Sequence, residues 1–131
     1  MGLKTLMFKL KRIYELAEPR DGFRVLVDRI WPRGVSKENA RIDLWMKEIA
    51  PSDALREWFG HSPSRWSGFQ RRYRGELKTK VGLLDQLREL EKKHGTVTLL
   101  YSAHDESRNQ AVVLHSFLHG GARAREPAPA E

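Results

Sequence analysis

The fold is decided by the stretch FRVLVDRIWPRG, residues 23–34. Its first five residues, 23–27, form a short run of mostly β-branched or aromatic character, which is typical of a buried strand. A strand cannot continue far beyond Asp28, because Pro32 has no backbone N–H for a sheet ladder and Gly34 favours a turn. The sequence therefore predicts a buried strand that ends at Asp28 and opens into a polar loop.

On both sides of this strand the chain alternates between strand patterns and helix patterns. Alternating apolar residues predict a strand at 6–11, and a short apolar run predicts another at 96–101. A further alternating segment, 42–47, is short enough to be either extended or a helical turn. Helices are expected from a Ser52 cap to Gly60, from Ser62-Pro63-Ser64 through Leu77, from 81 to the residue before Lys92, and over 111–118.

Strands separated by helices predict a small layered α/β domain with a mixed, partly parallel sheet flanked by helices. The length of 131 residues fits one domain, which we expect over 1–119. Residues 120–131 have almost no large apolar side chains, so we expect them to form a disordered tail. In sheets of this kind ligands bind outside the carboxyl ends of the strands.

The composition excludes several classes of site. The chain has no cysteine, so disulfides, thiolate metal sites and cysteine nucleophiles are absent.

Lysines interrupt the apolar residues of positions 1–12, so no secretion signal or membrane span is expected, and the expected location is the cytoplasm. The net charge of +7 favours anionic partners. His115 and His119 have a chelating spacing, but no suitable third ligand accompanies them, and no metal site is predicted.

The loop 28–37 is the first candidate site. Arg29 and Arg33 can hold a phosphate or carboxylate through two-point hydrogen bonds, and Trp31 offers a stacking face, so these three are candidate substrate-binding residues. Asp28 is a candidate catalytic acid/base group, and arginines beside it would hold it ionised. The simpler interpretation is that Asp28 pairs with one of the arginines while Trp31 fills the core.

The loop 102–109 is the second candidate site, because it follows the apolar run 96–101 and precedes a helix. Ser102 and Asn109 are candidate substrate-binding residues, and Asp105 is a second candidate catalytic group. The simpler interpretation is that Asp105 or Ser107 caps the following helix.

The string Asp28-Arg29-Ile30-Trp31-Pro32-Arg33-Gly34 is the most specific motif of the chain. It is accompanied, in order over about residues 8–118, by Asp21-Gly22, Val25-Leu26-Val27, Trp45 with Lys47, Ala50-Pro51-Ser52, and Leu99-Leu100-Tyr101-Ser102-Ala103 with Asp105 and Asn109. Together these strings resemble the YeaO-like family of bacterial domains of unknown function. The resemblance implies a compact α/β fold and points to these positions, and it supplies no catalytic roles.

Three functions of different classes are compatible with these patterns. The favoured one is binding of a small phosphate- or carboxylate-bearing ligand at the two loops; whether an enzymatic step accompanies binding stays open, and no cofactor is assigned. A second possible function is that of a structural or protein-binding domain without a polar pocket. The alternative to ligand binding is a nucleic-acid-binding module acting through the basic stretch 65–80, with Arg65, Arg71, Arg72, Arg74, Lys78 and Lys80 on the phosphate backbone.

Overall fold

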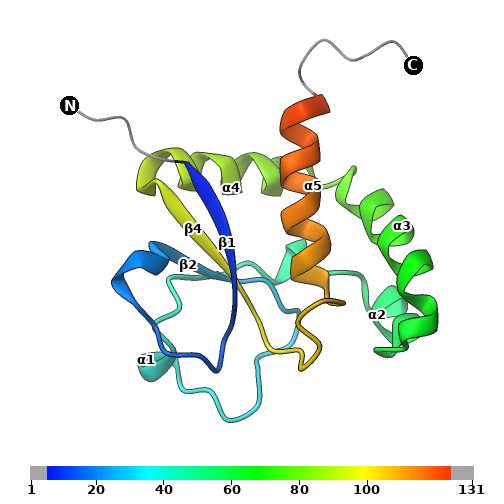
Figure 1. The fold of residues 1–131 in the computed structure, drawn as a ribbon, viewed down its shortest axis with the longest axis horizontal. Helices are drawn as coiled ribbons and strands as arrows, with labels where there is room; N and C mark the ends of the chain where they lie inside the picture. Colours follow the sequence, from blue (N-terminus) through cyan, green and yellow to red (C-terminus); the bar gives the residue numbers. More distant parts are fainter. Residues whose placement is uncertain (1–5, 125–131) are drawn as a thin grey trace.

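Four short strands form one sheet in the computed structural model, which describes residues 6–124 (Figure 1). The strand order is β1-β4-β2-β3, and all three pairings are parallel. The predicted α/β class is confirmed, and the sheet is more uniformly parallel than the predicted mixed sheet. The strands are β1 (Met7–Arg12), β2 (Phe23–Leu26), β3 (Leu44–Trp45) and β4 (Thr96–Tyr101).

The helices that the sequence predicts begin close to their expected positions, and a short helix over Lys37–Ala40, which ends the loop 28–37, is not predicted. Helix α2 (Asp53–Phe59) begins where Ser52 Oγ accepts the N–H of Leu55, and it ends at Gly60 in the left-handed region, with φ 50°. A 3₁₀ turn, η3 (Pro63–Arg65), leads into the third helix. The others are α1 (Lys37–Ala40), α3 (Trp66–Leu77), α4 (Val81–His94) and α5 (Gln110–Ala124), with 3₁₀ turns η1 (Pro19–Asp21) and η2 (Lys47–Ile49).

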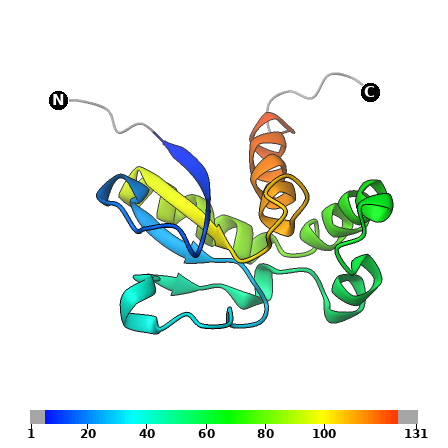
Figure 2. The same ribbon diagram turned by 60° about the horizontal axis from the view of Figure 1, so that its bottom comes forward.

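The main core lies on the sheet face that the longer helices cover. Alternate strand residues point to this face, as the two-residue period of a strand requires. In Figure 2, α4 passes behind β2 and β4. The buried side chains of this core include Phe8, Val25, Val97 and Leu99 from the strands, Phe59 from α2, Phe69, Tyr73 and Leu77 from α3, Leu87 from α4, and Leu114 and Leu118 from α5.

The opposite sheet face is covered by loops and by the single turn of α1. Leu26 and Leu100 point to this side and pack with Ile13 and Ala40 in a second, smaller buried cluster. The helices therefore gather on one face, and the polar segments that leave the strands cover the other. Since all the strands run in the same direction, their carboxyl ends meet at one edge of the sheet.

The C-terminal helix reaches further than the sequence predicts. Helix α5 continues to Ala124, beyond the domain boundary expected at residue 119. The remainder of the expected tail, 125–131, lies outside the described residues, so its disorder stays a prediction. Among the helices that the structure describes, none is long and apolar enough to cross a membrane.

Candidate functional site

Asp28 and Ser102 meet at the carboxyl edge of the sheet. Strands β2 and β4 are neighbours in register, with Leu26 opposite Leu100, so the residues two positions further on also lie opposite each other. One carboxylate oxygen of Asp28, Oδ2, accepts hydrogen bonds from the backbone N–H and the Oγ of Ser102, at 3.2 and 2.5 Å. The other, Oδ1, accepts from Nε2 of Gln110 at 2.5 Å. The two loops therefore leave neighbouring strands and come into direct contact.

The electrostatic setting of Asp28 differs from the one that the sequence predicts. Burial raises the pKa of its carboxyl group, and the hydrogen bonds from Ser102 and Gln110 and the charge of His61 offset only part of this effect. The residue is 8% exposed. Within residues 6–124 no ion pair joins Asp28 to an arginine, so the expectation of an arginine that holds it ionised is wrong. Neutral donors hold it instead.

Arg29 turns away from Asp28 and holds the neighbouring segment in place. Its Nε and Nη2 donate to the carbonyl oxygens of Pro51 and Ala50, at 3.0 and 3.1 Å. Its Nη1 lies 3.7 Å from Glu48 Oε1. These contacts tie the 28–37 loop to the segment before α2, so Arg29 shapes the site while each of its three side-chain nitrogens faces a partner in the protein.

Trp31 is also largely committed to structure. Its Nε1–H donates to the carbonyl oxygen of Val35 at 2.8 Å, which closes the loop on itself. Its ring contacts Trp45 edge to face, with centroids 5.2 Å apart, and packs on the smaller buried cluster. The simpler interpretation of Trp31, as a ring that fills the core, describes most of its contacts.

A pocket of about 350 Å³ opens between the two loops, which is within the range of small-molecule sites. Its buried part includes Asp28, Asn109 and the rings of Phe59 and Phe69. Exposed side chains line part of its rim, and three of them are cationic or titratable, namely Arg33, Arg56 and His61. The residues that complete the lining are Arg29, Ile30, Trp31, Pro32, Ala50, Pro51, Ser102, Ala103 and Gln110.

Arg33 is the candidate binding residue whose side chain is free. Its guanidinium makes no hydrogen bond or ion pair with the part of the chain that the structure describes. Only its backbone takes part, because the carbonyl oxygen accepts the Tyr14 hydroxyl at 2.8 Å. The side chain therefore lines the pocket with all its donors available.

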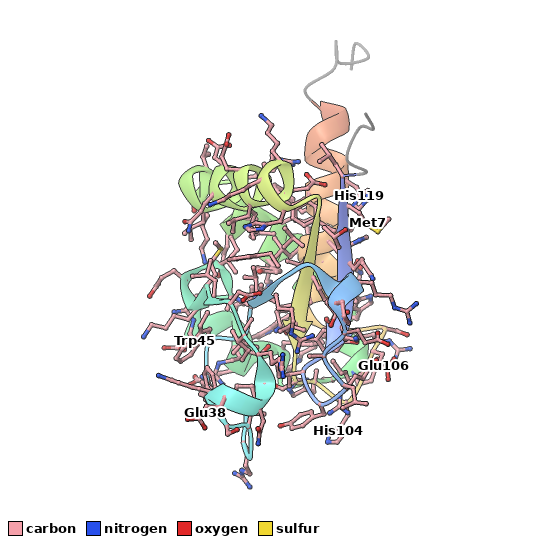
Figure 3. All side chains as sticks on the ribbon, turned by 90° about the vertical axis from the view of Figure 1, so that its left-hand side faces the viewer. Met7, Glu38, Trp45, His104, Glu106 and His119 are labelled. Atoms are coloured by element: carbon pink, nitrogen blue, oxygen red, sulfur yellow. The ribbon has the colours of Figure 1, made fainter. Side chains whose placement is uncertain are left out.

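The 102–109 loop divides between the pocket and the cap of α5. Asp105 does not line the pocket; its carboxylate accepts the N–H groups of Ser107 and Arg108, and these hydrogen bonds lower its pKa. Asn109 lines the pocket, and both ends of its amide already make a hydrogen bond, since Oδ1 accepts the N–H of Val112 and Nδ2 donates to the carbonyl oxygen of Asp105. The helix cap is thus Asn109, in place of the predicted Asp105 or Ser107. Figure 3 labels His104 and Glu106, two exposed residues of this loop, in the lower part of the view.

The basic stretch 65–80 is largely occupied within the protein. Arg65 and Arg72 lie over the ring of Trp58, at 5.2 and 4.0 Å from its centroid. Arg74 donates to Ser116 Oγ at 2.8 Å. Lys80 donates to the carbonyl oxygens of Glu48 and Ala50. These contacts explain most of the basic side chains without a nucleic acid.

The two histidines of α5 also have structural partners. His115 Nε2 lies 2.9 Å from the carbonyl oxygen of Phe8, at the outer edge of β1, and His119 Nδ1 lies 2.9 Å from the carbonyl oxygen of His115. Figure 3 labels His119 and Met7 where α5 lies beside β1. Across residues 6–124, no three histidine, aspartate or glutamate side chains gather closely enough to hold a metal ion.

Comparison with known proteins identifies the family. Residues 7–131 match the model of a family described as the inactive DUF488-N3 subclade. The chain belongs to this family. It is 42% identical over 112 residues to the uncharacterized protein Rv3073c of Mycobacterium tuberculosis, covering 86% of this chain and 93% of that protein. It is also 42% identical over 108 residues to the uncharacterized protein YeaO of Escherichia coli K12, covering 82% and 93%. No solved structure matches it.

Membership of the DUF488-N3 subclade confirms the resemblance to YeaO-like domains, and it leaves the site to be argued from geometry. Sequence reasoning missed Gln110, Arg56 and His61. Gln110 follows directly on the 102–109 loop, so a boundary one residue later would have included it. Arg56 and His61 come from α2 and the turn after it, and only the tertiary packing of α2, which contacts α3, brings them to the pocket. The backbone φ of His61 is 57°, which is uncommon for a residue other than glycine.

Proposed function

We propose that this protein binds a small phosphate- or carboxylate-bearing ligand in the pocket between the 28–37 and 102–109 loops. The observation that carries the proposal is Arg33, an exposed guanidinium that lines a pocket of about 350 Å³ and has no partner among the described residues. An unpaired guanidinium fork matches the geometry of a carboxylate or phosphate. Arg56 and His61 add donors to the lining of the same pocket.

Binding without catalysis is the form of this proposal that the chemistry supports. Ser102 Oγ donates to Asp28 and has no imidazole among its described hydrogen-bond partners to activate it. Asp105, the second candidate catalytic group, lies outside the pocket lining. The description of the family as an inactive subclade agrees with a binding role. We assign Asp28 to ligand contact rather than to acid/base work.

Nucleic-acid binding is not favoured by any specific contact. Four of the six basic side chains in the stretch 65–80 bind the protein itself, namely Arg65, Arg72, Arg74 and Lys80. Arg71 and Lys78 are the two cations of this set without such a contact among the described residues, and Arg65 and Arg72, though exposed, are held against Trp58.

The test is the substitution Arg33→Ala, with Lys37→Ala as its control. Both residues are exposed cations of the same loop, but Lys37 does not line the pocket. Inorganic phosphate, phenyl phosphate and 3-phenylpropanoate are titrated while amide shifts are followed by NMR. We expect Arg33→Ala to weaken binding by roughly 1.5–3 kcal/mol, the value of a hydrogen bond to a charged group. We expect Lys37→Ala to leave binding unchanged.

Folding should be nearly unaffected by Arg33→Ala, because the Tyr14 hydrogen bond goes to the backbone carbonyl, which alanine retains. A change in unfolding free energy within about 0.5 kcal/mol is expected, as for other exposed positions. If the variant unfolds, or if it binds every anion as well as the parent protein does, the proposed function is wrong.

A further inference from the structure

The floor of the pocket holds a carboxylate without a cation. Asp28 is 8% exposed, and its described partners are the neutral groups of Ser102 and Gln110. Arg29, its neighbour in the chain, turns toward the carbonyl oxygens of Pro51 and Ala50. His61 influences Asp28 by its charge, but no ion pair joins them in the part of the chain that the structure describes.

Such a carboxylate is costly unless something compensates its charge. A buried ionised group loses its hydration, and the three neutral hydrogen-bond donors from Ser102 and Gln110 offset only part of that cost for Asp28, because burial still raises its pKa. The floor also has unused acceptors. Oδ1 of Asp28 accepts a single hydrogen bond, and Oε1 of Gln110 accepts none from the described residues. Nε2 of Gln110 must face the carboxylate as the donor, so Oε1 is the free end of that amide.

The same pocket is also lined by exposed side chains that carry hydrogen-bond donors. Arg33 offers a free guanidinium, Arg56 lies 3.4 Å from Asp53 with donors to spare, and His61 is exposed. The lining also includes the apolar rings of Phe59 and Phe69. The pocket thus presents acceptors at its floor, an apolar wall, and donors at its rim.

Building on the proposed anion pocket, we infer that its ligand is amphoteric. A protonated amine would contact the carboxylate of Asp28 and Oε1 of Gln110, a carboxylate or phosphate would contact Arg33, and an apolar body would pack against Phe59. An α-amino acid with a large apolar side chain has these features, although its two charges lie close together. A longer amine-bearing anion separates them further.

The experiment compares probes that differ by one charged group. Phenylalanine, 3-phenylpropanoate and phenethylamine share a phenyl body and carry both charges, the negative charge alone, or the positive charge alone. A second set, 6-aminohexanoate, hexanoate and hexylamine, places the charges further apart. Dissociation constants are measured by NMR titration of the full chain. At least one amphoteric probe should bind about ten times more tightly than both of its singly charged analogues, the factor that roughly 1.4 kcal/mol provides.

Variants then test which residue contacts each charged group of the ligand. Asp28→Asn, which keeps the shape of the side chain, should remove the preference for the amphoteric probe over its amine-free analogue. Arg33→Ala should remove the preference over the amine alone. Asp105→Asn changes a carboxylate outside the pocket lining and should do neither. Because the parent protein already ranks the probes, the comparison decides the matter even if Asp28→Asn does not fold.

The results distinguish a failure of this inference from a failure of the proposed function. If, in both sets, the anionic analogue binds at least as tightly as the amphoteric probe, and Arg33→Ala weakens its binding, the ligand is a simple anion; the inference is overturned and the proposed function stands. If no probe and no phosphate compound binds, both the inference and the proposed function are wrong. A preference that survives Asp28→Asn would also overturn the assignment of the amine to Asp28.

Discussion

At Gly22, the turn before β2 has no room for a side chain. Its φ of 67° is in the left-handed region that L-residues rarely adopt. A Cβ at this position would collide with the carbonyl oxygen of Thr96, in the backbone of β4, at a separation of 2.3 Å. Since β4 pairs directly with β2, neither side of this contact can move without disturbing the sheet that positions Asp28.

The substitution Gly22→Ala should therefore destabilise the protein by roughly 2–5 kcal/mol, combining backbone strain with a steric clash. Gly34→Ala is the matched control, because Gly34 also has a positive φ, 77°, but a methyl group there would meet nothing within 4 Å. Only the conformational cost, about 1–2 kcal/mol, is expected at that position. Urea unfolding of both variants checks this, and equal losses would show that the close contact with β4 is unimportant.

At the scale of elements, helices α2 and α3 are joined by one carboxylate. Glu76 lies in the last turn of α3, where a negative charge opposes the helix dipole. Its Oε1 accepts the N–H of Ser52 at 2.8 Å, and its Oε2 accepts the Ser52 hydroxyl at 2.6 Å. Ser52 Oγ in turn caps α2 through the N–H of Leu55. The start of α2, and with it the position of Arg56 at the pocket, depends on this joint.

Ser52→Ala and Glu76→Ala should be strongly non-additive. Each variant alone should lose about 1–3 kcal/mol of unfolding free energy, because each breaks charged hydrogen bonds at the joint. In the double variant, the coupling energy should be about 1 kcal/mol or more. The parent protein and its variants are compared by chemical denaturation, with Ser36→Ala, which removes the cap of α1, as a control that should add independently to Glu76→Ala. If the losses of unfolding free energy at Ser52 and Glu76 were additive, the two residues would not act together to connect α2 and α3.

At the scale of the whole molecule, two buried aspartates make opposite contributions to stability as the pH changes. Burial alone would raise the pKa of Asp21, but the N–H of Glu18 and the side chains of Lys11 and Arg24 donate to it and lower the pKa below 3.8. Its contribution is complete above pH 3.8 and is lost as the pH falls through the folded pKa. Burial raises the pKa of Asp28, so its contribution is complete below 3.8 and is lost as the pH rises through the folded pKa.

Asp21→Asn should cost roughly 3–5 kcal/mol at neutral pH, because it leaves Arg24 and Lys11 without their buried partner. That loss should shrink as the pH falls below 3.8. Relative to the parent protein, Asp28→Asn should become more favourable as the pH rises above 3.8. Unfolding free energies measured between about pH 3 and pH 8 check both trends. A loss for Asp21→Asn that is independent of pH would show that its ionisation is not linked to folding.

The sequence by itself determined the elements. The run 23–27 is apolar and short, Ser52 and Gly60 bracket α2, and Pro32 with Gly34 ends the second strand, because these signals depend on local backbone chemistry. It also placed Arg33 and Ser102 in loops that meet, since parallel strands bring their carboxyl ends to one edge. Where several residues of one loop can cap a helix, the pattern favours the wrong one: it indicates Asp105 or Ser107 for α5, and the structure uses Asn109.

Only the tertiary structure decided which of these side chains are free. Arg29 and Arg33 are both arginines of one loop, yet Arg29 meets the carbonyls before α2, while the Arg33 side chain meets none among the described residues. The same packing buries Asp28 without an arginine partner in residues 6–124 and brings His61 to the pocket from a turn far along the chain. A hydrogen-bond partner distant in sequence depends on how helices pack on the sheet, and the residue pattern carries no record of that packing.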